Sequence, residues 1–328
     1  MTELALFGTD LFGEVVRPKA SGPVAERFTL PPFTILDART GEWQERKRAW
    51  LSLGITSGDG RDSGVSFGAG VGGEKSIQKG VCTHITKGTS PEVAKVFEAA
   101  GAGAGVFDPV VCELAYRWFS AEGAQVVDPF AGGSVRGIVA GALGRKYWGC
   151  DLRQEQIDAN NAQADEIETT HRPQWVCGDS METLPDAPEA DLIFSCPPYG
   201  DLEVYSDNPN DLSNMEWHTF VAAYKRIILK SVQRLKPDSF ACFVVGDFRD
   251  KKGFYRNFVS ATIDAFEECG ARLYNEAILA TSVGSAAMRV TKQFESGRKM
   301  AKTHQNVLVF CKGDWRAAAA KCNGIGNA

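Results

Sequence analysis

The sequence predicts an α/β fold built on a mostly parallel sheet, for two reasons. Short apolar segments that stop at Gly, Asp, Ser or Pro alternate with amphipathic segments of helical length, a pattern typical of parallel strands joined by helices. Seven segments of the first kind follow residue 124, and a chain of 328 residues is long enough for one large core or two modest ones. The first 50 residues lack this pattern and predict an irregular N-terminal extension.

Composition divides the chain into four parts. We expect residues 1–53 to pack on the core as the extension and residues 89–316 to form the main domain. Between them, residues 54–88 should form a flexible loop, because nine glycines fall within residues 54–80 and such a stretch cannot offset its ordering entropy by burial. Residues 317–328 predict a disordered tail.

Two elements are expected in the extension. Residues 28–36 indicate an extended segment interrupted by prolines, and residues 42–51 indicate a short helix with Trp43, Trp50 and a basic run at 46–48. Two interpretations of this helix remain open. Its tryptophans pack on the main core, or the helix presents a basic and aromatic surface to a phosphate backbone.

A strand, a glycine turn and a second strand follow two expected helices, at 90–100 and 110–119. The turn is Asp128-Pro-Phe-Ala-Gly-Gly-Ser134, a helix over 138–143 comes next, and the second strand ends at Asp151. In nucleoside-binding βαβ units, glycines let the backbone approach the ligand and an acid after the second strand accepts ribose hydroxyls. A nicotinamide enzyme shares both features, so this unit alone does not identify the ligand.

The remaining elements continue the alternation of strands and helices. We expect strands at 174–177, 191–194, 240–245, 272–281 and 306–311, and helices at 154–167, 220–235 and 254–269.

The strand over 191–194 leads into the most informative stretch of the chain, Ser195-Cys-Pro-Pro-Tyr199. Prolines donate no ladder hydrogen bond, so the chain must turn over the carboxyl edge of the sheet, where ligands of open α/β sheets bind. Tyr199 and the backbone carbonyls beside it would suit a planar base with an exocyclic amino group. A proline-rich turn with an aromatic plug is the alternative.

Charge and cysteine usage restrict the class of protein. The net charge is only −5, so any nucleic-acid surface must be local. Nine cysteines without a CxxC pair, and four scattered histidines, favour reduced thiols in the cytoplasm and no metal site. No signal peptide and no apolar run of membrane-spanning length is apparent, so we expect a protein without a membrane partner.

Four motifs together resemble those of S-adenosylmethionine-dependent DNA amino-methyltransferases, the N4-cytosine and N6-adenine enzymes, including those of phages and prophages. They are Asp128–Ser134, Gly149-Cys-Asp151, Gly178-Asp-Ser180 and Ser195–Tyr199, each at a strand end. The resemblance covers roughly residues 105–312. It implies a Rossmann-like methyltransferase sheet of seven strands, with the cofactor half first.

The resemblance also implies roles for individual residues. Asp128 would lie near the amino group of the methionine part of S-adenosylmethionine, Asp151 would hold the ribose and Asp179 the adenine amino group. The other residues implied in cofactor binding are Phe130, Gly132, Gly133, Ser134 and Ser195. The catalytic turn would comprise Cys196, Pro197, Pro198 and Tyr199, with the Pro197 carbonyl and the residue-196 side chain accepting the amine hydrogens and Tyr199 stacking on a flipped base.

Two positions depart from the family pattern. Ser134 replaces a glycine, and Cys196 stands where the family has Asp, Asn or Ser, although a thiol is a weak acceptor. We expect methylation of an exocyclic amine, with N4 of cytosine weakly preferred. The alternatives are methylation of the cytosine ring carbon with Cys196 as nucleophile, an RNA substrate, and an inactive DNA-binding module.

Charge between the last two strands predicts the DNA contact. The 282–305 connection, with help from residues 42–50, should grip double-stranded DNA from which the target base is flipped, whereas the acidic 201–216 segment should not. Whether the protein is a monomer or a homodimer stays open. The cations of this connection are Arg289, Lys292, Arg298, Lys299 and Lys302.

Overall fold

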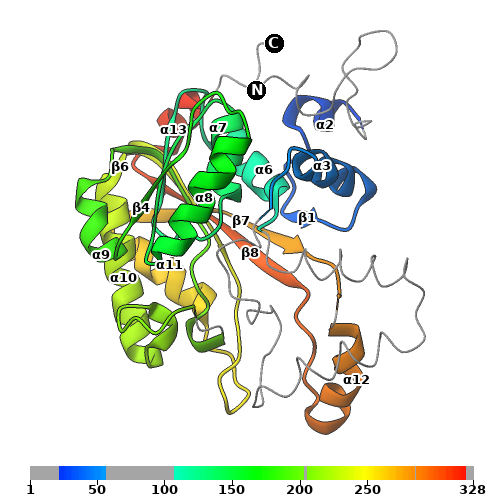
Figure 1. Cartoon of the computed structure of the whole chain (residues 1–328). Coiled ribbons are helices and arrows are strands. Elements are labelled where there is room, and N and C mark those ends of the chain that lie inside the picture. Colours follow the sequence, from blue (N-terminus) through cyan, green and yellow to red (C-terminus); the bar gives the residue numbers. More distant parts are fainter. Residues whose placement is uncertain (1–21, 57–106, 203–204, 285, 323–328) are drawn as a thin grey trace.

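A single twisted sheet forms the centre of the molecule (Figure 1). The computed structural model describes residues 22–56, 107–202, 205–284 and 286–322. Its strand order is β1-β7-β8-β6-β5-β2-β3-β4, and neighbours are parallel except that β8 is antiparallel to β6 and β7. The strands are β1 (Ile35–Asp37), β2 (Gln125–Asp128), β3 (Lys146–Asp151), β4 (Gln174–Cys177), β5 (Ala190–Ser195), β6 (Leu235–Val245), β7 (Ala271–Ala280) and β8 (His304–Lys312).

This mixed, mostly parallel sheet confirms the predicted α/β fold class, with eight strands instead of seven. The extra strand is β1, which the N-terminal extension adds at the edge beside β7. Leu36 points into the core while Ile35 stays exposed. Three residues are too few to display a periodic pattern, which is why the sequence indicated only an extended segment here.

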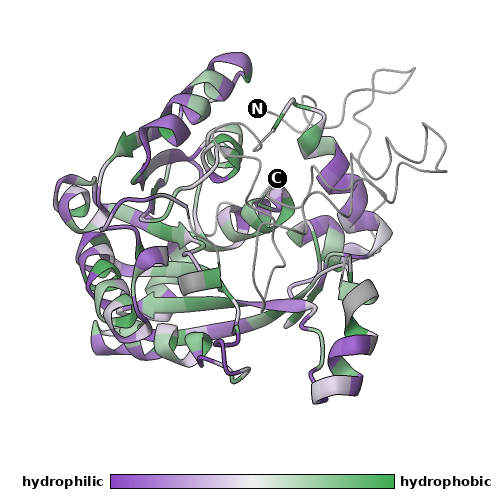
Figure 2. Cartoon of the chain, turned by 60° about the horizontal axis from the view of Figure 1, so that its bottom comes forward, coloured by the Kyte–Doolittle hydropathy of each residue, from purple (hydrophilic) through white to green (hydrophobic). Residues whose placement is uncertain are grey.

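Helices cover both faces of the sheet, and alternate strand residues face opposite cores. Val126 belongs to one buried cluster and Val127, its neighbour in β2, to the other. The first face carries α3 (Gly41–Leu51), α6 (Pro109–Phe119), α7 (Val135–Ala142), α8 (Gln154–Glu166) and α13 (Trp315–Lys321). The second carries α9 (Ser180–Thr183), α10 (Trp217–Arg234) and α11 (Phe258–Glu268). Figure 2 shows apolar residues along the central strands between these layers.

Several short elements and one separate helix complete the described part of the chain. Figure 1 shows α12 (Ala286–Gly297) at the lower right, away from the helices that cover the sheet. The short elements are α2 (Pro23–Phe28), η2 (Leu184–Asp186), η3 (Gly200–Leu202) and η4 (Leu212–Asn214). The helix expected over 90–100 and residues 57–88 of the glycine-rich loop lie outside the described residues.

The extension is tied to the main domain through α3. Trp43 and Trp50 are buried in the core, and the Trp50 indole donates a hydrogen bond of 2.9 Å to the buried carboxylate of Glu113. Arg46 forms a buried ion pair with the same carboxylate, and Lys47 lies 3.2 Å from Asp108. The tryptophans therefore pack on the core, and the interpretation of α3 as a basic and aromatic surface is wrong for Trp43, Arg46 and Trp50, whereas Lys47 lines the cavity described below.

Two boundaries differ from the sequence prediction. The expected disordered tail begins with a helix instead, because Asp314 caps α13 and this helix buries its own Ala318, while residues 323–328 lie outside the described residues. The expected helix over 254–269 begins only at Phe258, because Asn257 adopts a left-handed conformation (φ 55°) and residues 249–255 form a hairpin.

Replacing Glu113 with glutamine should lower the free energy of unfolding by about 3–5 kcal/mol, because a neutral amide then replaces the buried carboxylate that pairs with Arg46 and Arg117. Urea denaturation measures the change. Asp165→Asn is the control, since it removes an exposed ion pair with Arg172 and should change stability by less than about 1 kcal/mol.

The effect of Glu113→Gln should depend on pH. Burial opposes ionisation of Glu113, but the charges of Arg46 and Arg117 outweigh it and hold its pKa below the ordinary value. The stabilisation is therefore present above the unfolded-state pKa of about 4.3 and is lost as pH falls through the folded-state pKa. A stability gap between parent and variant that does not narrow on acidification would contradict this assignment.

Candidate active site

One cavity of about 1040 Å³ opens at the carboxyl ends of the parallel strands. The glycine turn after β2 and the ends of β3 and β4 line one side. The turn after β5 and the segments after β6 and β7 line the other. In open α/β sheets this edge is where ligands bind, so both halves of the predicted site face a common space.

Hydrogen bonds fix the glycine turn from both sides. Gly132 has a φ of 50°, a left-handed conformation that disfavours residues with a Cβ. Its N–H donates to the Asp151 carboxylate (3.1 Å), and its carbonyl accepts from the Asn160 amide (2.8 Å). The Ala131 N–H donates to the Cys150 carbonyl (2.9 Å). The turn is therefore held to β3 and α8 before any ligand binds.

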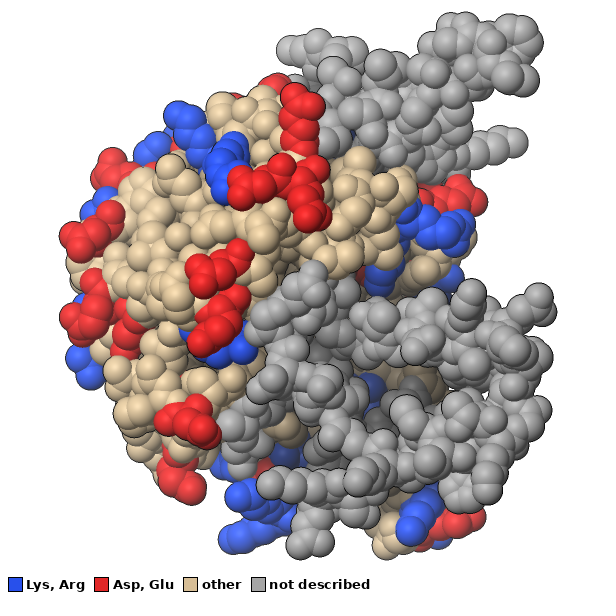
Figure 3. All heavy atoms as spheres, in the orientation of Figure 1, with Lys and Arg blue, Asp and Glu red and all other residues tan. Residues whose placement is uncertain are grey.

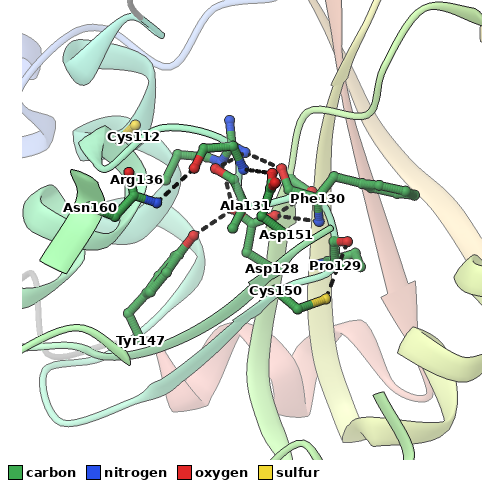
Figure 4. Close-up of polar contacts among 12 residues, drawn as sticks. Cys112, Asp128, Pro129, Phe130, Ala131, Arg136, Tyr147, Cys150, Asp151 and Asn160 are labelled. Carbon is green, nitrogen blue, oxygen red and sulfur yellow. Dashed lines mark hydrogen bonds and ion pairs between the residues drawn. The ribbon is translucent and has the colours of Figure 1, made fainter. Parts of the chain in front are cut away.

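Asp128 organises the base of this turn (Figure 4). Its carboxylate is fully buried and accepts hydrogen bonds from four donors. The Phe130 N–H (3.0 Å) and the Ser195 hydroxyl donate to Oδ1, while Arg136 Nε (2.6 Å) and the Tyr147 hydroxyl (2.7 Å) donate to Oδ2. The four donors come from the turn, β5, α7 and β3.

Arg136 extends the same network along the turn. Its guanidinium donates to the carbonyls of Phe130 and Ala131 and lies 4.8 Å from the centre of the Phe107 ring. Burial alone would lower the pKa of Arg136, but the Asp128 carboxylate outweighs it and the pKa is raised. Arg136 is thus a permanent cation inside the protein, and its positive charge pairs with the carboxylate of Asp128.

Three residues expected to bind the cofactor lie behind the cavity wall. Asp128 has no exposed surface, and four internal donors occupy its oxygens. Ser195 is fully buried and donates to that carboxylate, and Ser134 is buried with its hydroxyl on Gln163. The structure therefore brings these residues next to the site without placing them at its surface. Phe130, Gly132, Gly133, Asp151 and Asp179 do line the cavity.

Asp151 and Asp179 present carboxylates to this side of the cavity. Asp151 accepts the N–H groups of Gly132 and Arg153, one on each oxygen, which leaves further lone pairs for a ligand. Burial raises its pKa above the ordinary value, although these hydrogen bonds act in the opposite direction. Asp179 caps α9 through one oxygen, which accepts the Met181 N–H.

The turn after β5 forms part of the opposite wall. Cys196, Pro197 and Pro198 line the cavity, and Cys196 is half-buried. Within the described parts of the chain, the carbonyl oxygens of Pro197 and Pro198 accept no hydrogen bond. Since prolines also lack an N–H, this stretch offers acceptors and no competing backbone donor.

Tyr199 is held in place by its neighbours. Its ring lies edge-on to Phe258 (6.0 Å between centroids) and 6.2 Å from Phe248, and its hydroxyl accepts a hydrogen bond from Gln305 (2.6 Å). Burial raises its pKa far above the ordinary value, so the phenol stays neutral. Tyr199 lines the cavity, while its hydroxyl is hydrogen-bonded to Gln305, and its role as a stacking platform stays a prediction.

Residues after β6 and at the start of β8 join this wall, and the sequence prediction did not single out most of them. Asp247 follows β6 and lines the cavity with His304 and Gln305. Burial and the nearby Lys302 lower the pKa of His304, which favours its neutral form. Asp247 can be found from the sequence, because Gly246-Asp247 directly follows the expected strand over 240–245. His304 and Gln305 carry no motif, and only the antiparallel pairing of β8 brings them here.

Only two of the five expected DNA-binding cations line the cavity. Lys299 and Lys302 line it, whereas Lys292 and Arg298 are exposed on and just after α12. Arg289 lies in α12, but its side chain is outside the described part. Figure 3 shows Lys and Arg side chains gathered at the lower end of this face.

Neither a metal-binding cluster nor a membrane-spanning helix is found among the described residues. Among residues 22–56, 107–202, 205–284 and 286–322, no three His, Cys, Asp or Glu side chains converge as a metal site would require. In the same ranges, no helix has both the length and the apolar character needed to span a membrane.

Comparison with solved structures yields only distant similarity. TrmN from Thermus thermophilus is 15% identical with a TM-score of 0.42, and the match spans 63% of this chain and 49% of that one, about half its length. A TehB-like SAM-dependent methyltransferase from Corynebacterium glutamicum is 18% identical over 67% and 96% of the two chains (TM-score 0.40). Magnesium protoporphyrin IX methyltransferase (ChlM) from Synechocystis, solved with bound SAM, is 10% identical over 74% and 86% (TM-score 0.40).

At such low identities and TM-scores these similarities do not establish what this chain binds or acts on. No protein-family model matches the chain, and no curated protein sequence matches it.

Proposed function

We propose that this protein transfers a methyl group from S-adenosylmethionine to an exocyclic amino group of a base in DNA. One observation carries the proposal. A single cavity is lined both by the glycine turn with Asp151 and Asp179, and by the Cys196–Tyr199 turn. A nucleotide-binding half and an amine-accepting half that share a cavity can bring a methyl donor and its acceptor into contact.

The first half suits S-adenosylmethionine. The left-handed Gly132 allows backbone to approach a ligand closely, and the carboxylate of Asp151 has lone pairs left for two ribose hydroxyls. Asp179 lies on the same side and would accept from the adenine amino group, and Phe130 adds an apolar contact. When bound, this cofactor supplies a methyl carbon made electrophilic by its sulfonium, and no metal is required.

The second half suits an aromatic amine. Such an amine is a poor nucleophile because its lone pair is delocalised into the ring. Acceptors on its hydrogens localise that lone pair, and at this wall lie the carbonyls of Pro197 and Pro198, which accept no hydrogen bond from the described residues. The ring of Tyr199, held by Phe248 and Phe258, offers a base a surface for stacking, worth about 1–3 kcal/mol.

Cytosine is weakly preferred over adenine as the target. Cys196 is closest in shape to the serine of cytosine-type motifs. The cations at the cavity mouth favour a polyanionic substrate, which we assign to double-stranded DNA with one base flipped out.

The direct test is transfer of a tritiated methyl group from S-adenosylmethionine to duplex DNA of mixed sequence, to RNA and to protein. Label in N4-methylcytosine or N6-methyladenine after digestion supports the proposal. Label in RNA alone would assign the other nucleic acid. Cofactor binding without transfer to any of the three would indicate an inactive binding module.

Asp151→Ala should weaken binding of S-adenosylmethionine about 10–100-fold, because the variant loses charge-assisted hydrogen bonds worth about 1.5–3 kcal/mol. Isothermal titration calorimetry measures the affinity. Asp158→Ala is the control, since this acid is exposed on α8 and outside the cavity. Equal affinities in parent and Asp151→Ala would remove Asp151 from the cofactor site.

Cys196→Ser should retain or raise the transfer rate, because oxygen accepts an amine hydrogen better than sulfur does. Methylation of the cytosine ring carbon predicts the opposite, since a serine hydroxyl cannot replace an attacking thiolate. Duplex DNA with 5-fluorocytosine separates the two reactions. A covalent adduct that disappears in Cys196→Ala would overturn amine methylation in favour of the ring carbon.

A further inference from the structure

A tight hairpin over residues 248–256 rises beside the cavity mouth. Arg249 and Tyr255 form its antiparallel bridge, and both line the cavity. At the tip, the Phe254 N–H donates to the Asp250 carboxylate (2.9 Å), and the Asp250 N–H donates to the Phe254 carbonyl (2.8 Å). Gly253 completes the turn with a φ of 93°. Arg249 and Tyr255 form the stem of the hairpin and belong to the site. Residues 250–254 form its tip and do not line the cavity.

The tip is rigid for so short a segment. Backbone N–H donation, from Phe254 above all, holds the pKa of Asp250 below its ordinary value. The guanidinium of Arg249 lies 4.0 Å from the centre of the Tyr255 ring and donates to the Gly253 carbonyl (2.8 Å). The end of the Lys299 side chain lies against Gly253, where a Cβ would come within 2.6 Å of the Lys299 Nζ.

This rigid tip exposes a large apolar side chain. The Phe254 ring is 72% exposed, and in the described parts of the chain it contacts no other aromatic ring. Core packing therefore does not account for it. Removing apolar surface from water is favourable, so a partner that covers this ring would gain affinity.

The surroundings of Phe254 indicate the chemistry of that partner. Lys251 and Lys252 are exposed next to it on the hairpin, and Lys299 contacts the turn from the end of α12. Arg298 is exposed beside Lys299. An apolar ring surrounded by cations fits a polyanion with an apolar interior, which describes duplex DNA. A protein partner with a purely apolar groove would not match the cations.

We propose that the 248–256 hairpin docks on duplex DNA and that the Phe254 ring enters the base stack, at the gap left when a base moves into the cavity. The inference rests on the proposed function. Apolar side chains inserted between base steps unstack the bases and kink the duplex. The stem at the cavity and the exposed ring at the tip give this hairpin the two contacts that such a role requires.

The test is equilibrium binding by fluorescence anisotropy, with S-adenosylhomocysteine present. The probes are a fluorescein-labelled 30-base-pair duplex of mixed sequence and the same duplex with one central abasic site. The parent protein should prefer the abasic duplex by about tenfold, consistent with the stacking energy of a ring placed in the gap. Phe254→Ala should bind both duplexes equally, and Phe254→Trp should keep the preference.

Matched controls separate the ring from its surroundings. Phe33→Ala removes a similarly exposed aromatic residue (69%) and should keep the preference. Phe33 precedes β1 and so lies toward the amino ends of the parallel strands, whereas the hairpin follows the carboxyl end of β6. Lys252→Ala should also keep the preference while reducing the slope of log affinity against log salt by about one. A full preference in Phe254→Ala, or none in the parent, would overturn the inference, and so would an unchanged salt slope in Lys252→Ala.

The outcomes also distinguish this inference from the proposed function. If the parent protein transfers methyl groups to DNA but shows no preference for the abasic duplex, the role of Phe254 is refuted and the proposed function stands. An abasic preference that depends on Phe254, in a protein that transfers no methyl group, would refute the enzymatic activity and support the hairpin.

Discussion

The buried pair of Asp128 and Arg136 is the constraint on which the site depends. Two opposite charges without access to water are stable only if both are paired and hydrogen-bonded, and removal of one partner costs about 3–5 kcal/mol. Asp128 meets that condition through four donors, and Arg136 through the carboxylate and two turn carbonyls. The glycine turn therefore cannot shift without breaking this network, so its shape is set before a ligand arrives.

The same carboxylate also fixes the two halves of the cavity relative to each other. Ser195 is the last residue of β5, directly before the Cys196–Tyr199 turn, and its hydroxyl is bonded to Asp128. Tyr147 brings in β3, whose end carries Asp151. The proposed transfer requires the methyl carbon and the amine nitrogen to be held about 3–3.5 Å apart and in line. A shared buried carboxylate fixes the position of one wall relative to the other.

The sequence predicted the elements that local patterns encode. The strands of the main domain, the glycine turn and the proline turn all depend on residues close together in the chain. In the structure the two turns lie at the carboxyl ends of the strands. The burial of Asp128 was not predictable, because an acid at a strand end has the same local pattern whether ligand or protein satisfies it. The hairpin at 248–256 was hidden for a related reason, since Phe254 and Tyr255 continue the apolar pattern of α11.

Charge is distributed unequally across the cavity, and the proposed ligands account for that distribution. Asp151, Asp179 and Asp211 line the cofactor side, where the charge of Asp211 adds to the raised pKa of Asp151. Lys299 and Lys302 line the opposite rim. A cationic sulfonium is attracted to the acidic wall and repelled by the basic rim, whereas a phosphate backbone experiences the reverse. This separation is partial, because Arg136 and Arg153 also line the cofactor side and Asp247 lies close enough to Lys302 to raise its pKa against the effect of burial.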